Sequence, residues 1–441
     1  MITGTTGCGL RYAVRKGGSS VGYCALSIKC GTRDEEGYHS GIAHFTEHTI
    51  FKGTAHKSAA VVNGYLDRLG GELNAYTTKE EIVIHATVLK EDLPKAAGLL
   101  LELATEATFP EKEIETEKGV VIDEIQSYKD SPADEVYDRF EEALYAGHPL
   151  GRPILGTPAS VRRITSEELR RFVREHFTPD RMAFTMMADL DESRMEREVR
   201  RLAKKYFPTV SEAKTETPPE NRATLGIVRG GDPSLLGGGP KDVFRGVSPR
   251  SDGNVGTSRF DKTVDKRNHE VNAVIGGPAP SLYEEKDRIA AVLLANILGG
   301  PASNSILNSI LRERNGWVYG VECGYTQYSD TGIMAISLGC DKENLEKCFS
   351  AISKAVGDLQ DKPLSDRRLK AAKKQLLGQL AIGSESGEAQ CLSMGKSLLA
   401  FGRVASSAEN KAAIEAVTAA DLQRLALRIF SPDNLSRLIY L

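Results

Sequence analysis

The sequence lacks a marked excess of charge of either sign, and it lacks long runs of apolar residues. Its 441 residues include 57 basic and 60 acidic side chains, which are mixed with apolar residues along most of the chain. A balanced charge gives no extended basic surface for nucleic acid, and no stretch approaches the roughly 20 apolar residues that span a bilayer. We therefore expect neither a nucleic-acid partner nor a membrane partner.

Cysteine pairs with metal-binding or redox spacing are missing as well. The seven cysteines are scattered without C-x-x-C spacing, and an odd number in a chain of this length is typical of reduced, structural thiols. The first residues show neither a basic start followed by an apolar core nor a cleavage pattern. These absences predict a cytoplasmic protein, although a precursor that has lost its targeting segment would show the same pattern.

Two domains of about 200 residues are expected from the length of the chain. Residues 209–266 are dense in Gly, Pro, Ser and charge, which is typical of a linker between domains 1–208 and 267–441. Each half contains β-like runs, helical segments, further β-runs, more helices and a final strand. This order predicts the α+β class with two structurally similar domains, each an antiparallel β-sheet packed with helices.

The segment 41–54, GIAHFTEHTIFKGT, places His44, Glu47 and His48 in the order H-x-x-E-H. On an α-helix these residues share one face, and Ser40 is the expected N-cap. Two imidazoles supply half of a tetrahedral zinc site, and a carboxylate beside them can take a proton from water. The five-residue motif alone fits equally well a surface helix that happens to carry two histidines.

A later helical segment, EKEIETEKGVVIDEIQSYKDSP, carries two acids that could complete such a site. Glu117 and Glu124 are two turns apart on the same face, and Val120, Val121 and Ile125 predict that this part of the helix is largely buried. Carboxylates on a buried face need partners, and a metal is one candidate. Lysines or neighbouring helices are the alternative partners.

HFTEHTIFKGT followed at this distance by EKGVVIDEI resembles the pitrilysin, or inverzincin, family of zinc metallopeptidases. In size the chain is similar to the bacterial processing-peptidase-like branch of that family. The resemblance implies that His44, His48 and Glu124 bind one Zn²⁺ per chain. It also implies that Glu47 is the general base and that Glu117 is an acidic partner in the catalytic site.

Two further segments match the family. In ELNAYTT, residues Asn74, Ala75 and Tyr76 resemble the strand that receives substrate as an added β-strand. In LRERNGWVYG, residues Arg312 and Tyr319 match the Arg and Tyr that reach the scissile carbonyl, where they would stabilise an oxyanion. Without the resemblance, these residues would be interpreted as an ordinary strand, a solvated arginine and a core aromatic.

The resemblance implies a zinc-dependent endopeptidase, a hydrolase that cleaves unfolded peptides or flexible protein termini inside a closed chamber. The family's shell is built from two domain pairs and this chain has one, so we expect a homodimer, or a heterodimer with a related chain. Arg312 and Tyr319 would then act on the zinc of the other subunit. Two other interpretations stay open: a non-catalytic or partner-dependent subunit of a processing-peptidase-like complex, and a maturation protease for one specific peptide.

Overall fold

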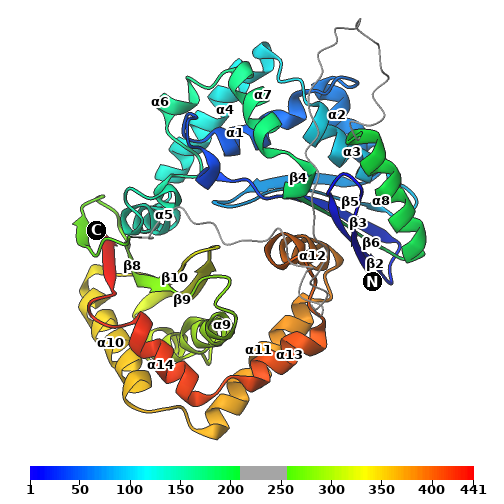
Figure 1. Cartoon of the computed structure of the whole chain (residues 1–441). Coiled ribbons are helices and arrows are strands. Elements are labelled where there is room, and N and C mark those ends of the chain that lie inside the picture. The colour runs from blue at the N-terminus through cyan, green and yellow to red at the C-terminus, as the bar shows by residue number, and fades with distance from the viewer. Residues whose placement is uncertain (209–255) are drawn as a thin grey trace, which may run out of the picture.

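The computed structural model describes residues 1–208 and 256–441, which form two halves that each contain one sheet (Figure 1). The greater part of the segment expected to be a linker, residues 209–255, lies outside the described residues. No helix in the described ranges has the length and apolar character needed to cross a membrane.

The sheet of the first half has six strands in the order β1-β2-β6-β3-β5-β4. All neighbouring strands are antiparallel except β2 and β6, which are parallel. Among the described residues, strand β4 pairs with β5 alone, so its other edge is free. The strands are β1 (Ile2–Thr5), β2 (Arg11–Lys16), β3 (Val21–Ile28), β4 (Glu72–Thr77), β5 (Ile82–Leu89) and β6 (Met182–Ala188).

The sheet of the second half has five strands in the order β7-β11-β8-β10-β9, again with one parallel pair, β7 and β11. In sequence order and sheet order, β2, β3, β4, β5 and β6 correspond to β7, β8, β9, β10 and β11. The expectation of two similar α+β domains is therefore confirmed, although each sheet is mixed rather than purely antiparallel. The strands are β7 (Asp261–Val264), β8 (Val271–Ala279), β9 (Val318–Gln327), β10 (Gly332–Cys340) and β11 (Ser436–Tyr440).

Strand β7 lies within the range 209–266 that was expected to be a linker. Its four residues are all exposed and show no alternation of apolar and polar side chains. Main-chain pairing with β11 holds this strand in place, and such pairing leaves no trace in a hydropathy pattern.

Between corresponding strands the helices follow a similar order, whereas the helix after β6, residues 192–206, has no counterpart after β11 in the described part of the chain. The first half contains η1 (Thr32–Asp34), α1 (Ile42–Thr49), η2 (Ile50–Lys52), α2 (Ala59–Asp67), α3 (Leu93–Glu106), α4 (Glu111–Lys129), α5 (Pro132–Leu144), η3 (Pro149–Gly151), α6 (Pro158–Val161), α7 (Ser166–His176), η4 (Pro179–Arg181) and α8 (Glu192–Tyr206). The second contains α9 (Glu285–Gly299), the π-helix η7 (Asn308–Arg314), η8 (Lys342–Asn344), α10 (Leu345–Asp361), α11 (Asp366–Gly383), α12 (Gly387–Phe401), α13 (Ser407–Ala416) and α14 (Ala419–Ile429).

The two halves exchange one helix each. Helix α5 of the first half packs Val136, Phe140 and Leu144 against strands β8, β10 and β11 of the second sheet. Helix α12 of the second half packs Met394 and Leu398 against β2 and β6 of the first sheet. In Figure 1 both helices lie at the level between the two sheets. The apolar core of each half is therefore completed by the other half.

Candidate metal centre

Helix α1, which carries the H-x-x-E-H motif, begins under a buried carboxylate. The Glu35 side chain is 2% exposed and accepts hydrogen bonds from the backbone N–H groups of Gly41 and Ala43, both at 3.0 Å. Gly41, with φ of 89°, is the N-cap in place of the expected Ser40. Glycine suits this left-handed position, and a Cβ there would also lie 2.8 Å from the Leu155 carbonyl oxygen.

Helices α1 and α4 bring His44, His48 and Glu124 together. One ligating atom from each of the three residues lies within 4.8 Å of the others. Glu124 Oε1 is 3.8 Å from His44 Nε2, and Glu124 Oε2 is 3.4 Å from His48 Nε2. The two imidazole ring centroids are 4.6 Å apart. The three predicted ligands therefore converge on one point with their Nε2 and carboxylate oxygen atoms.

Glu117 lies two helix turns before Glu124 and contacts the other ring nitrogen of His48. Its Oε1 is 2.9 Å from His48 Nδ1, and its Oε2 is 2.6 Å from Lys52 Nζ. A carboxylate on the second imidazole nitrogen fixes the ring so that Nε2 faces Glu124, an arrangement typical of histidines that bind metals. The structure thus places Glu117 against His48 and Lys52, where it can orient the imidazole.

The protonation states of the centre follow from burial and close charges. Burial, with a contribution from the charge of His48, lowers the pKa of His44 to about 4, which favours the neutral imidazole that a metal requires. Burial also lowers the pKa of His48, but the Glu117 and Glu124 carboxylates outweigh it and raise that pKa to about 9. The pKa of Glu47 is raised, chiefly by burial, while the charge of His48 opposes the rise.

The donor set fits a zinc ion. Two imidazoles and one carboxylate leave a fourth position open, which is the pattern of catalytic zinc sites. Within the described ranges the buried Glu124 Oε2 atom takes part in no hydrogen bond, so an oxygen that has lost its water hydration lies beside the two Nε2 atoms. A cation bound at this point would satisfy that oxygen.

The predicted substrate-binding residues Asn74, Ala75 and Tyr76 lie on β4, the free edge of the first sheet. Their side chains alternate between the two faces. Ala75 packs against the core that contains α1, and Tyr76 packs on the opposite face beside Cys391 of α12. The unpaired N–H and C=O groups of β4 can therefore accept an added strand beside the metal-binding helix.

Arg312 and Tyr319 lie in the second half, on η7 and β9. Tyr319 is 59% exposed and donates a hydrogen bond to Asp341 Oδ1 at 2.7 Å. Arg312 is exposed, and no polar contact of the described residues joins either side chain to the three clustered ligands. Within one chain, the structure does not bring these two residues into the metal centre.

Two models of known protein families match the sequence of this chain. Residues 13–158 match the insulinase family of peptidases, M16, and residues 163–376 match the M16 inactive domain. Together the two matches run through most of the chain and place the H-x-x-E-H helix in the first. The chain belongs to peptidase family M16. This confirms the resemblance to pitrilysin-type zinc metallopeptidases.

M16 relatives in bacteria have similar lengths. An uncharacterized zinc protease of Streptomyces coelicolor is 28% identical over 396 residues, which cover 90% of this chain and 80% of that protein. An uncharacterized zinc protease of Bacillus subtilis is 29% identical over 412 residues, 93% of this chain and 91% of that protein.

Solved structures share the M16 fold over the full length. A protease from Helicobacter pylori matches with a TM-score of 0.81 and 19% identity over 100% of this chain and 98% of that chain. A structure described as a peptidase M16 inactive domain from Pseudomonas fluorescens matches with a TM-score of 0.81 and 18% identity, over 100% and 97%. At these identities the comparison shows the fold.

Sequence reasoning missed two residues of this M16 centre. Glu35 lies in a polar segment, and only the folded backbone shows that it caps α1. Lys52 lies in the FKGT end of the motif segment, and its ion pair with Glu117 depends on the packing of η2 against α4. Val120, expected on the buried face of α4, is exposed, whereas Val121 and Ile125 are buried.

Proposed function

We propose that the chain is a zinc endopeptidase that hydrolyses unfolded peptides or flexible protein termini inside a chamber closed by two subunits. The observation that carries the proposal is the convergence of His44, His48 and Glu124 directly beside a free strand edge. The curated relatives are named zinc proteases, which supports the same chemistry.

The bound zinc would supply a Lewis acid that polarises the scissile carbonyl and lowers the pKa of water. Glu47 accepts the proton of the attacking water and later passes it to the leaving amine. Its pKa, raised by burial, brings the carboxyl closer to neutral pH, where a general base works best. Glu117 holds His48 in the orientation that directs Nε2 to the centre.

Substrate binds as an additional strand on β4. Main-chain hydrogen bonds to the free edge at Asn74, Ala75 and Tyr76 are independent of the side chains of the peptide, which suits an enzyme that accepts many sequences. A segment that adds as a strand must be extended and free of other pairing over its length, a condition that unfolded peptides and flexible termini meet, so these are the proposed substrates.

Arg312 and Tyr319 act in trans. Both are exposed in the second half and lack polar contacts with the metal residues of their own chain, whereas the proposed chemistry needs donors at the developing oxyanion. A second copy of the chain, facing the first, would supply them. The active unit is a homodimer, and a heterodimer with a related chain would offer the same arrangement.

The decisive experiment measures metal content and cleavage of an unstructured peptide for the wild type, Glu47→Gln and the control Glu111→Gln. We expect about one zinc per chain in all three, and a loss of kcat on the order of 10²–10⁴ only in Glu47→Gln. Glu111 is an exposed acid at the start of α4, so its variant controls for the change of charge.

Metal without cleavage of any unrelated peptide would exclude broad endopeptidase activity and leave a partner-dependent subunit or a protease for one peptide. Sharing in trans is tested by mixing Glu47→Gln with Arg312→Ala. Each variant alone is expected to be inactive, and a mixed dimer regains one site with an intact Glu47 and an intact Arg312. Absence of recovery after subunit exchange contradicts sharing.

A further inference from the structure

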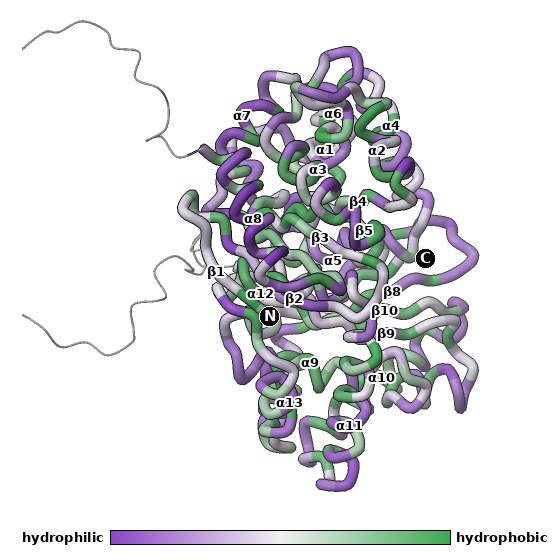
Figure 2. Tube along the Cα trace, turned by 90° about the vertical axis from the view of Figure 1, so that its right-hand side faces the viewer, coloured by the Kyte–Doolittle hydropathy of each residue, from purple (hydrophilic) through white to green (hydrophobic). Residues whose placement is uncertain are grey.

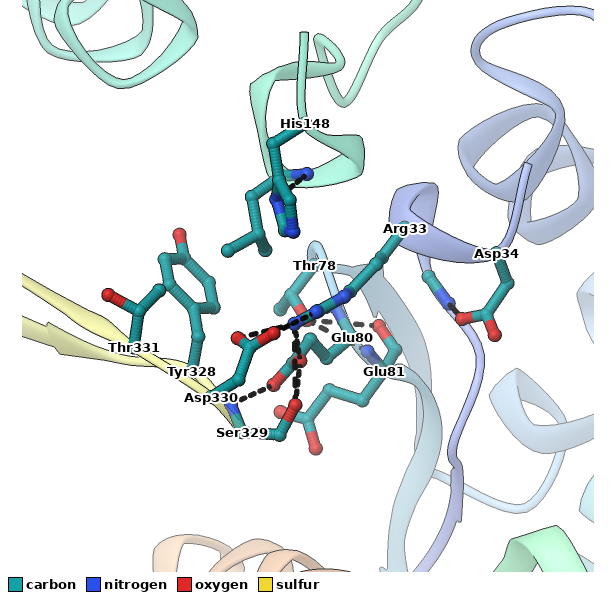
Figure 3. A network of polar contacts seen from close by, with 12 residues as sticks. Arg33, Asp34, Thr78, Glu80, Glu81, His148, Tyr328, Ser329, Asp330 and Thr331 are labelled. Carbon is teal, nitrogen blue, oxygen red and sulfur yellow. Dashed lines mark hydrogen bonds and ion pairs between the residues drawn. The ribbon is translucent and has the colours of Figure 1, made fainter. Parts of the chain in front are cut away.

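A buried cluster of polar side chains joins the two halves beside α5, whose Glu141 contacts both Lys79 and Tyr328. Arg33 extends from η1 to two hairpin turns, the β4–β5 turn of the first sheet and the β9–β10 turn of the second (Figure 3). These two turns correspond to each other in the two halves. The Arg33 side chain has no exposed surface, so its charge is compensated by protein groups rather than by water.

Hydrogen bonds and ion pairs connect Arg33 and Glu80 of the first half to Ser329 and Asp330 of the second. Arg33 donates to Asp330 Oδ1 at 2.8 Å and pairs with the second Asp330 oxygen as well, so that the guanidinium holds the carboxylate with two parallel bonds. The same guanidinium donates to Glu80 Oε1 at 2.8 Å. Ser329 donates to Glu80 through its backbone N–H at 2.9 Å and its hydroxyl at 2.5 Å. We call Arg33, Glu80, Ser329 and Asp330 the Arg33 latch.

The backbone beside the latch leads directly to the metal centre. Thr32 and Arg33 donate backbone hydrogen bonds to the carbonyls of Thr78 and Lys79, in the β4–β5 turn. Two residues after Arg33, Glu35 caps the helix that carries the H-x-x-E-H motif. The segment is therefore fixed to α1 and to the substrate-binding hairpin on one side and to the second half on the other.

The latch residues of the second half of the chain follow the strand that carries Tyr319, one of the proposed oxyanion donors. Ser329 and Asp330 form the turn that joins β9 to β10, and β9 carries Tyr319. The apolar contacts of α5 and α12 resist separation of the halves but are non-directional, whereas a bidentate guanidinium–carboxylate pair fixes both distance and angle. The latch is thus one directional contact between the substrate edge of one half and the Tyr319 strand of the other, beside the contacts of Glu141 on α5 with Lys79 and Tyr328.

We propose that the Arg33 latch sets the angle between the two halves of each subunit, and thereby sets how Arg312 and Tyr319 meet the metal centre of the other subunit. Arg33 and Asp330 are positioning residues in this role. The inference rests on the proposed function, because it needs the second half to act in trans. Binding of metal and of peptide belongs to the first half and does not depend on the latch.

The test uses Asp330→Asn, which keeps the shape of the side chain and leaves Glu80 paired with Arg33. We expect kcat to fall by about tenfold or more, since a displacement near 1 Å of a catalytic group costs up to about 10²-fold. Metal content and KM stay at wild-type values. In the Arg312→Ala background the same change gives a smaller further loss of the residual kcat, because only Tyr319 is left to be misplaced.

Asp287→Asn is the matched control. Asp287 pairs with Arg424 at 2.5 Å and is 18% exposed against 12% for Asp330, but both of its partners lie within the second half. We expect this variant to retain wild-type kcat. Should Asp330→Asn fail to fold, Ser329→Ala removes the hydroxyl that donates to Glu80 and accepts from Arg33, and it is expected to lower kcat as well.

Mixing experiments separate positioning from stability. Asp330→Asn misplaces its own Arg312 but keeps its own Glu47, so a mixture with Glu47→Gln regains activity several-fold, whereas a mixture with Arg312→Ala does not. The inference is wrong if the kcat losses of Asp330→Asn and Arg312→Ala add fully in the double variant. It is also wrong if the loss of kcat follows a loss of bound metal. If wild type cleaves nothing, or Glu47→Gln and Arg312→Ala fail to complement each other, the proposed function itself has failed.

Discussion

The two halves have the same order of strands, yet within the described residues only the first gathers side chains that could hold a metal. In the first half α1 and α4 meet through His44, His48 and Glu124. In the corresponding place of the second half, α9 and α11 meet through a neutral amide pair, Asn296 Nδ2 to Gln379 Oε1 at 2.8 Å. The same arrangement of helices therefore holds possible metal ligands in one half and a hydrogen bond between two neutral amides in the other. The difference lies in the side chains at the helix crossing.

The largest expected effect comes from changing that crossing. Glu124→Gln should reduce metal content to near zero and abolish peptide cleavage, because an amide is a poor replacement for an anionic zinc ligand. Gln379→Leu, at the matching crossing, should keep one zinc per chain and cost only about 1 kcal/mol of stability for the lost hydrogen bond. Metal analysis and urea unfolding of both variants measure this contrast. Full metal content in Glu124→Gln would show that the centre lies elsewhere.

The exchanged helices give the next largest effect. Phe140 of α5 is fully buried on the second sheet, and Leu398 of α12 is buried on the first. We expect Phe140→Ala to cost about 3–5 kcal/mol and Leu398→Ala about 2–5 kcal/mol, each in a single cooperative transition, because each core belongs to both halves. Denaturant unfolding followed by two probes measures this, with the exposed Leu427→Ala as a control within about 0.5 kcal/mol.

Two separate transitions, with each variant shifting only one of them, would mean that the halves fold independently despite the exchange.

The exchange marks where sequence reasoning reaches its limit. Helical periodicity predicts that His44 and His48 share one face and that Glu117 and Glu124 share another, whereas the choice of Glu124 as the third ligand came from the resemblance to the pitrilysin family. The pattern of α5 shows that one face is apolar, but it cannot show which sheet that face covers. The partner surface is a property of the tertiary fold, so the exchange of α5 and α12 could not be predicted.

Predictions about individual residues also fail where the outcome depends on tertiary packing. Val120 and Val121 are neighbours on α4 and equally apolar, yet only the packing of α4 decides that Val121 is buried and Val120 is exposed. The Arg33 latch joins positions nearly 300 residues apart, and an arginine in a polar segment gives no sign that its side chain will be fully buried. Nothing in the sequence distinguishes Glu35 from other polar-segment acids, because its role depends on the position of the start of α1 in the fold.

The smallest expected effect concerns two carboxylates at helix N-termini, one in each half. Burial raises the pKa of Glu35 to about 8 from its ordinary 4.5. At Asp421 of α14, hydrogen bonds from Thr418 are the main cause of a pKa lowered to about 2. A raised folded-state pKa gives stability that is present below pH 4.5 and is lost as pH rises through 8. A lowered pKa gives stability that is present above pH 3.8 and is lost as pH falls through 2.

Glu35→Gln and Asp421→Asn should therefore change the pH dependence of stability with opposite signs. Between pH 5 and 8 the unfolding free energy of the wild type should fall relative to Glu35→Gln, by no more than about 1.4 kcal/mol per pH unit. Asp421→Asn should run parallel to the wild type in that range and diverge only in acid. A flat difference for Glu35→Gln would mean that the two backbone donors at Gly41 and Ala43 outweigh burial and keep the carboxylate ionised, so that α1 begins on a fixed negative charge.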